Sequence, residues 1–318
     1  MNPYRATIGV SALILLLSSS IAACSATDVP ATPQLFSPGV ISGSASEDSL
    51  SFTPDGNTVF FDRAKWPNSI IMVSHKMNGN WSKPEIASFS GQWLDHDPVV
   101  SPDGSFIVFA SNRPATPQDK LVSTGGVLWR VDRKGKGWGT PWRLPNTVNV
   151  SPRSYAPSIA ADGSLYFIRP GADNIMHIFR SQYRDGKYLP AVQVAVGDPA
   201  THQKDPAIAP DQSFIVFDSD DAAKQDPDRL FIAFRQGDHW GKAIDLGDAV
   251  NARNNPWGPH LDPTGRMLYY TSDRSVPLAY PRTREQAEKD LSRLEDWDNG
   301  ENNIWYVSLA SIIATHRT

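Results

Sequence analysis

The sequence predicts an all-β fold, a five-bladed β-propeller of four-stranded antiparallel blades closed by an N-terminal strand. The first observation is a strand–turn–strand phrase that recurs five times, at 49–63, 97–113, 156–169, 205–220 and 258–274. The second is its period, because the corresponding turn residues are 48, 59, 49 and 53 residues apart. A period of this length is typical of propeller blades. These turn residues are Asp55, Asp103, Asp162, Asp211 and Thr264.

Each repeat carries the residues that a strand, a tight turn and a second strand require. A short strand leads into a Pro-Asp-Gly-type turn, and a strand rich in Val, Ile, Phe and Tyr follows. Proline presets one backbone dihedral, aspartate binds the following backbone, and glycine takes the positive φ. We therefore expect Asp55, Asp103, Asp162 and Asp211 to form turns and not to act as catalysts.

The two ends of the chain are predicted to meet in one blade. The first four repeats continue into a third strand, an aromatic-bearing turn and a fourth strand, but the fifth stops after its third strand at 303–309. Residues 31–43 resemble 139–151 and are predicted to supply the missing strand. Closing the ring in this way removes an exposed sheet edge. Six blades are the alternative count.

Composition excludes two classes of protein. Among 318 residues, Lys and Arg number 30 and Asp and Glu number 34, which gives a net charge of −4. A general nucleic-acid binder needs surplus cations to replace phosphate counterions, so no nucleic-acid partner is expected. The chain has one cysteine, which excludes an internal disulfide framework.

The N-terminus has the pattern of a secretory signal. Residues 8–17 are mostly apolar, small residues follow, and the run is too short to span a bilayer. The segment Ile21-Ala22-Ala23-Cys24 resembles the bacterial lipoprotein signal box, which implies lipidation of Cys24 by fatty acids such as palmitate. The alternative is an ordinary signal peptide with an incidental cysteine.

These observations divide the chain into three parts. Residues 1–23 are predicted to be the lipoprotein signal peptide, 24–31 a lipidated tether, and 32–318 a single propeller domain with a helical insertion near 282–297. Ser25 follows the cysteine where aspartate would be the inner-membrane signal, so the resemblance implies an outer-membrane protein facing the periplasm.

Two of the repeats resemble a known family. The phrases SPDGSFIVFASNR (101–113) and LDPTGRMLYYTSDR (261–274) are similar to the TolB-like β-propeller repeat, and the resemblance covers roughly residues 31–310. It implies the propeller fold. It implies no single activity, because the family includes protein-binding scaffolds, peptidase accessory domains and some sugar-processing enzymes.

The candidate site lies where the first strands of the blades begin. The loops before these strands and the loops joining the second and third strands share one face, here called the loop-rich face; the Pro-Asp-Gly turns form the opposite turn face. We expect ligand contacts from residues that enter the first strands, although acids there can instead brace neighbouring blades. The ligand-binding candidates are His96, Asp97, Tyr155, His202, Lys204, Asp205, Trp257 and His260. The catalytic candidates are Asp48, Asp97, Asp205 and His260.

A second set of candidates is cationic. Arg63, Arg113, Arg169 and Arg274 each end the second strand of a blade and could together bind the carboxylate or sulfate groups of an anionic glycan. The alternative is that each arginine pairs with an acid of an adjacent blade.

The insertion at 275–302 contains a predicted helix. Thr283 and Gln286 form a capping-box pattern, and Ala287, Leu291 and Leu294 follow as an apolar stripe. We expect this helix to lie across the loop-rich mouth as a lid or a partner surface.

The remaining question is the molecular task. The sequence has no G-x-S-x-G elbow, no H-E-x-x-H pair and no glycine-rich phosphate loop, so no cofactor and no metal site are predicted. The first hypothesis is an envelope scaffold that binds a protein or glycan through the loop-rich face. The alternative is a carbohydrate-active hydrolase or lyase that uses the acids and histidines at the channel mouth.

Anchoring is directly testable. Replacing Cys24 with serine (Cys24→Ser) should move the protein from the membrane fraction to the soluble fraction, because each buried lipid methylene contributes about 0.8 kcal/mol to membrane binding. Fractionation followed by immunoblotting measures the change, with Ser25→Ala as the control. Full retention of the Cys24→Ser protein on the membrane would contradict the lipoprotein prediction.

Overall fold

The computed structural model describes Met1 and residues 30–65, 68–116, 126–220, 227–251 and 255–316. The predicted signal peptide and Cys24 lie outside the described residues. No helix in the described ranges is long and apolar enough to cross a bilayer.

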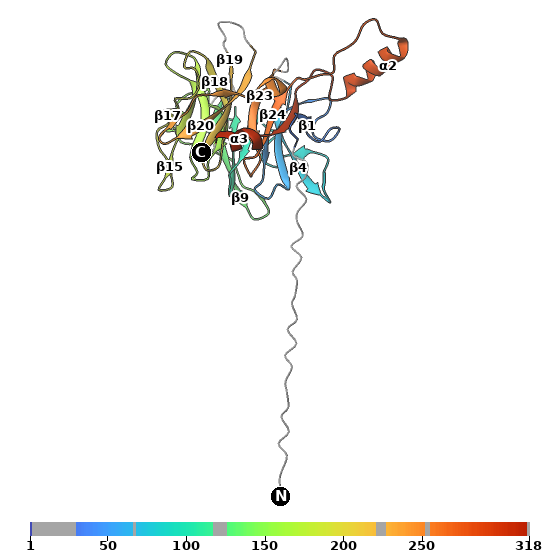
Figure 1. Cartoon of the computed structure of the whole chain (residues 1–318). Helices are drawn as coiled ribbons and strands as arrows, with labels where there is room; N and C mark the ends of the chain where they lie inside the picture. The colour runs from blue at the N-terminus through green and yellow to red at the C-terminus, as the bar shows by residue number, and fades with distance from the viewer. Residues whose placement is uncertain (2–29, 66–67, 117–125, 221–226, 252–254, 317–318) are drawn as a thin grey trace.

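Five antiparallel sheets are arranged as the blades of a propeller (Figure 1), so the predicted fold class and blade count are confirmed. The innermost strands are β2 (Ser46–Phe52), β7 (Asp95–Val100), β12 (Tyr155–Ile159), β18 (His202–Ile208) and β23 (Trp257–Leu261). The second strands are β3 (Thr58–Lys65), β8 (Phe106–Ser111), β13 (Leu165–Pro170), β19 (Phe214–Asp220) and β24 (Met267–Ser272). The third strands are β4 (Asn68–Met77), β9 (Val127–Lys134), β14 (Met176–Ser181), β20 (Arg229–Gln236) and β25 (Asn303–Ser308).

The outer edges are short and broken. Blade 1 ends in β5 (Asn80–Trp81) and β6 (Glu85–Ile86), blade 2 in β10 (Gly137–Trp138) and β11 (Trp142–Arg143), and blade 4 in β21 (His239–Trp240) and β22 (Ile244–Asp245). Blade 3 ends in β17 (Val192–Gln193) after a hairpin of β15 (Tyr183–Arg184) and β16 (Lys187–Tyr188). Helices are few: α1 (Asp248–Asn251), α2 (Arg284–Ser292), the 3-10 turn η1 (Arg293–Glu295) and α3 (Ala310–His316).

The repeated turns form as the sequence predicts. The Asp55 carboxylate accepts the Asn57 backbone N–H at 3.1 Å, and Gly56 takes a φ of 67°. Asp103, Asp162 and Asp211 accept the backbone N–H two residues later in the same way, at 3.0, 2.8 and 3.0 Å. In the fifth turn the carboxylate comes from Asp262, which accepts the Thr264 N–H.

The N-terminal strand closes the ring. β1 (Gln34–Leu35) pairs with β25, with Leu35 opposite Trp305, and the Phe36 N–H donates to the Ile304 carbonyl at 2.8 Å. The Phe36 ring packs against four aromatic side chains from blades 1 and 5, at centroid distances of 5.3 to 6.1 Å. One strand of two residues therefore joins the two ends of the chain.

The apolar core is divided into five clusters, each between two neighbouring blades. Between blades 1 and 2, for example, Phe60 and Ile71 meet Phe109 and Trp129. Burying each large side chain contributes about 1.5–3 kcal/mol. Because every blade supplies half of two clusters, the blades depend on their neighbours.

The predicted helix is present, but it does not lie across the loop-rich mouth. Thr283 Oγ1 accepts the Gln286 N–H and the Gln286 side chain accepts the Thr283 N–H, which completes the capping box. α2 lies out at the side of the propeller (Figure 1), with Leu291 66% and Leu294 61% exposed. The expected lid across the mouth is therefore wrong, because the stripe packs on no blade.

Closure by the N-terminal strand predicts where this segment contributes stability. Phe36→Ala should lower the free energy of unfolding by about 3–5 kcal/mol, because the ring is 8% exposed and leaves a cavity among aromatics. Val40→Ala is the control, since Val40 is 37% exposed. Chemical denaturation measures both, and equal effects would mean that the ring closes by other contacts.

Candidate functional site

All five innermost strands contain an irregularity at the same register. The ladder shifts there by one residue, and the shifted residues have φ angles of 53°, 55°, 46°, 45° and 57°. Such a bulge re-aims the side chains and turns a backbone N–H out of the ladder. The bulge residues are Ser49, Asp97, Ala156, Asp205 and Gly258.

Carboxylates of one blade accept the bulge N–H of the next. Asp62 accepts the Asp97 N–H at 2.7 Å, Asp97 accepts the Ala156 N–H at 2.9 Å, and Asp218 accepts the Gly258 N–H at 3.3 Å. These three bonds join blades 1 to 2, 2 to 3 and 4 to 5. The acids at this level therefore brace the inner ring.

Asp97 is the most heavily bonded of these acids. It accepts the Ser49 hydroxyl at 3.0 Å, and His96 Nδ1 lies 3.0 Å from its other oxygen. The His96 ring itself lies 5.9 Å from the Tyr155 ring. Burial alone would raise the pKa of Asp97, but His96, the Ala156 N–H and Ser49 lower it to about 2. Asp97 is therefore a fixed anion whose lone pairs are used within the protein.

Two carboxyl pairs flank this anion. Asp48 interacts with Asp62, and Asp205 with Asp218, in each case from the first strand to the second strand of one blade. Burial and the Asp97 charge raise the pKa of Asp48 and of Asp205 to about 7. Burial also raises the pKa of both partners well above its usual value. The raised pKa values favour a protonated carboxyl group in each pair.

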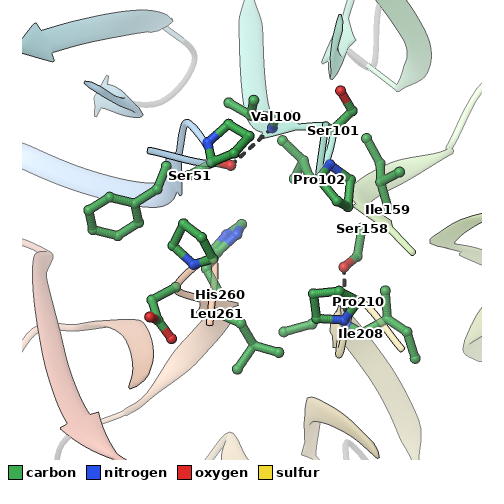
Figure 2. Close-up of a pocket in the computed structure, with 16 residues that line it drawn as sticks. Ser51, Val100, Ser101, Pro102, Ser158, Ile159, Ile208, Pro210, His260 and Leu261 are labelled. Atoms are coloured by element: carbon green, nitrogen blue, oxygen red, sulfur yellow. Dashed lines mark hydrogen bonds between the residues drawn. The ribbon is translucent and has the colours of Figure 1, made fainter. Parts of the chain in front are cut away.

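His260 lies deeper in the channel than the mouth where the sequence placed it. Its register partner is Tyr269, beyond the bulge, and it lines a cavity of about 240 Å³ at the turn-face end of the channel (Figure 2). All five blades contribute to this cavity, whose walls are mostly apolar and include the turn residues Pro54, Pro102 and Pro210. Burial lowers the pKa of His260 to about 4, so the ring is neutral at pH 7.

The three candidate histidines do not converge. His96 contacts Asp97 at the bulge level, His260 lies in the turn-end cavity, and His202 Nδ1 accepts the Met176 N–H at 3.0 Å. Within the described ranges, no three His, Cys, Asp or Glu side chains have a geometry that would hold a metal ion.

Lys204 is held within its own blade. Its ammonium lies 3.6, 3.3 and 2.5 Å from Asp218, Asp220 and Asp228. Burial alone would lower the pKa of Lys204, and these carboxylates outweigh burial and raise it. Trp257, the equivalent residue of blade 5, is half-buried in β23 opposite Thr271.

Two of the four arginines pair with acids, and the other two stack on aromatic rings. Arg63 bonds Glu47 at 2.9 Å and Arg113 bonds Asp95 at 2.6 Å, each within its own blade. Arg169 lies 3.8 Å from the centroid of the Phe179 ring, and Arg274 lies 5.1 Å from the Trp305 ring. The expected pairing with an adjacent blade is replaced by contacts within the blade.

The acids Asp62 and Asp218 were missed by the sequence analysis. Both follow the phenylalanine of the second strand, at the register position where blades 2, 3 and 5 have Ala110, Ile168 and Thr271. A charged residue inside an otherwise apolar strand is the signal that marks them, because such a residue needs a buried partner.

No protein-family model and no curated protein matches the sequence. Solved structures that superpose on it include a provisional TolB from Agrobacterium tumefaciens, at 15% identity and a TM-score of 0.49 over 83% of this chain and 91% of that one. TolB from Acinetobacter baumannii has 13% identity and a TM-score of 0.49, and the match covers 83% of this chain but only 54% of that protein. Hydrazine synthase from Kuenenia stuttgartiensis has 16% identity and a TM-score of 0.40 over 81% of this chain and 73% of that one.

The carboxyl pairs predict a pH dependence. The pKa of Asp48 is about 7 in the folded protein and 3.8 ordinarily, so the folded state binds a proton that the unfolded state releases between these pH values. The stability of the fold therefore decreases as the pH rises from 3.8 to about 7. Relative to Asp48→Asn, the wild type should lose about 2 kcal/mol of unfolding free energy between about pH 5 and pH 8.

The comparison has a matched control. Asp55 has a lowered pKa and an exposed carboxylate, so Asp55→Asn should leave the profile unchanged over the same range. The His260 contribution is common to all three proteins and cancels. Chemical denaturation at several pH values measures the unfolding free energy of each protein. The same pH dependence for Asp48→Asn and wild type would contradict a raised pKa at Asp48.

Proposed function

We propose that the protein is a lipid-anchored scaffold of the cell envelope, at the outer membrane facing the periplasm, that binds an envelope protein or glycan through its loop-rich face. The observation that carries this proposal is the insertion of blade 5. It exposes five large apolar side chains to solvent, with exposed fractions between 48% and 70%. Large apolar side chains left exposed in one segment favour an interaction surface there. These residues are Val276, Leu278, Tyr280, Leu291 and Leu294.

Ion pairs hold the insertion in place, while its five large apolar side chains stay exposed. Arg282 bonds Asp290 at 2.7 Å, Arg284 bonds Glu288 at 2.9 Å, and Arg293 bonds Asp298 and the Val276 carbonyl. A surface held in place before binding loses less conformational entropy when a partner docks.

The point where the chain enters the propeller indicates which face an anchor at the N-terminus would turn towards the membrane. The Pro30 carbonyl accepts the Ser308 N–H at 3.0 Å, and the next residue, Leu309, bonds Arg266 in a turn of the turn face. From Cys24 to Pro30 an extended chain spans at most about 20 Å. An anchor at Cys24 would therefore hold the turn face towards the membrane and leave the loop-rich face accessible.

The hydrolase alternative has less support. A glycosidase needs two accessible carboxyl groups about 5–9 Å apart, with substrate or water between them. Here Asp48 and Asp62 are 7% and 1% exposed and lie opposite each other on the first and second strands, and Asp97 is bonded on both oxygens. Burial and the Asp97 charge account for the raised pKa of Asp48, so the shift needs no catalytic role.

Site-specific crosslinking tests the proposal. A photoreactive residue at position 294 should capture a discrete partner in whole cells, and Leu291→Asp should reduce the adduct by about tenfold because a charge resists burial. The same photoreactive residue at Ile86, which is 54% exposed on blade 1, is the control. Protease treatment of the adduct distinguishes protein from glycan, and equal yields from both positions would contradict the proposal.

A further inference from the structure

A groove between blades 2 and 3 is separate from both the exposed insertion of blade 5 and the central channel. It has a volume of about 550 Å³ and lies between β11 with its following loop and the β15–β16 hairpin. We call it the interblade groove. Its lining combines three aromatic rings, those of Trp142, Tyr183 and Tyr188, with the cations Arg130, Arg143 and Lys187.

Trp142 presents a fixed aromatic surface. Its indole N–H donates to the Asp132 carboxylate at 2.8 Å, yet the side chain remains 41% exposed. The same position in the other blades is Glu85, Val192 or Ile244, read from the pairing with the third strand. An exposed tryptophan that is already oriented costs little entropy to use in binding.

Three cations surround this ring and only one has an acid partner. Arg130 bonds Asp132 and lies 3.6 Å from the centroid of the Phe106 ring. Arg143 donates to Asn146 Oδ1 at 2.7 Å and to backbone carbonyls, all neutral groups. Lys187 is exposed and pairs with no carboxylate in the described part of the chain. The groove therefore carries uncompensated positive charge.

Two tyrosine rings form the floor of the groove. Tyr188 is 7% exposed, and its ring centroid lies 5.0 Å from that of Tyr183, which fixes the position of both rings. The Tyr188 hydroxyl is buried and interacts with Arg130, so it belongs to the wall of the groove.

We propose that the interblade groove binds an acidic saccharide, a chain that contains uronic acid units. The apolar face of a sugar ring packs on Trp142, and the carboxylate is bound by Arg143 and Lys187. Neutral sugars lack the group that the cations require. This site lies outside the loop-rich face, so it does not rest on the proposed function.

The neighbouring groove between blades 3 and 4 provides an internal contrast. Val192 occupies the position of Trp142 there, and Asp238 and His239 lie where the interblade groove has Gly186 and Lys187. That groove also contains Trp240, Arg180 and Arg235, so the two grooves differ at the positions of Trp142 and Lys187 and not in having aromatic and cationic residues.

Calorimetric titration of the full-length protein with trigalacturonate tests the site. Wild type should bind, and the neutral galactose trimer should bind about tenfold more weakly or not at all. Trp142→Ala and Lys187→Glu should each weaken trigalacturonate binding by about tenfold. Added salt should weaken binding of the acidic trimer more than that of the neutral one.

Matched variants separate the groove from general effects. Val192→Ala removes an exposed apolar side chain at the equivalent position, and Lys134→Glu makes the same charge change on an exposed hairpin outside the groove. Both should change affinity by less than about twofold. Unchanged melting temperatures show that each variant is folded.

Several outcomes would overturn the proposal. They are no binding of trigalacturonate by wild type, equal binding of the neutral trimer, or equal losses in the groove and control variants. Binding to phosphatidylglycerol vesicles or to polyglutamate, but not to trigalacturonate, would replace the saccharide with an anionic membrane or an acidic peptide. Loss of the crosslinked partner at position 294 would leave this result untouched, because the two surfaces are separate.

Discussion

The structure depends on how five strands meet around one axis. Each innermost strand bulges at the same register, and in blades 2, 3 and 5 the bulge N–H donates to a carboxylate of the preceding blade. A buried N–H requires an acceptor, and a carboxylate is a strong one. Asp62, Asp97 and Asp218 are thus explained by backbone geometry before any ligand is considered.

Grouping these carboxylates also changes their pKa values, because carboxylates that lie close together cannot all ionise. Asp97 takes the negative charge, since His96 and two hydrogen-bond donors stabilise it. The flanking pairs keep protons as a result. A polar ring that looks like an active site from its residue types is therefore a bonded framework, and the surfaces proposed for binding are the exposed insertion of blade 5 and the interblade groove.

The repeat pattern predicted the architecture well because turns and strand periods are local. The Pro-Asp-Gly turns and the blade count follow from short-range chemistry, whereas the closing strand, which pairs Leu35 with Trp305, was predicted from the resemblance of residues 31–43 to 139–151. Which side chains are buried was harder to predict: Val40 is exposed next to the buried Ile41, because it lies in a turn where both N–H groups donate to the Ser37 carbonyl. His260 is three residues further along β23 than Trp257, and the bulge lies between them. The sequence does not show this bulge, so it placed His260 at the mouth with Trp257. The partners of Arg63 and Arg113 lie 16 and 18 residues earlier, across a hairpin whose register the sequence does not specify.

The closing strand also fixes the order in which the molecule can be completed. Leu35 is among the first residues of the fold to be synthesised, and its partner Trp305 is among the last. Until that partner emerges, β1 has no sheet to join, whereas blades 1 to 4 can already stack on one another from contacts close in sequence. A chain that crosses a membrane during this interval does so with an unfinished fifth blade. Its N-terminal segment must remain unpaired, and available to a chaperone, for almost the whole of synthesis.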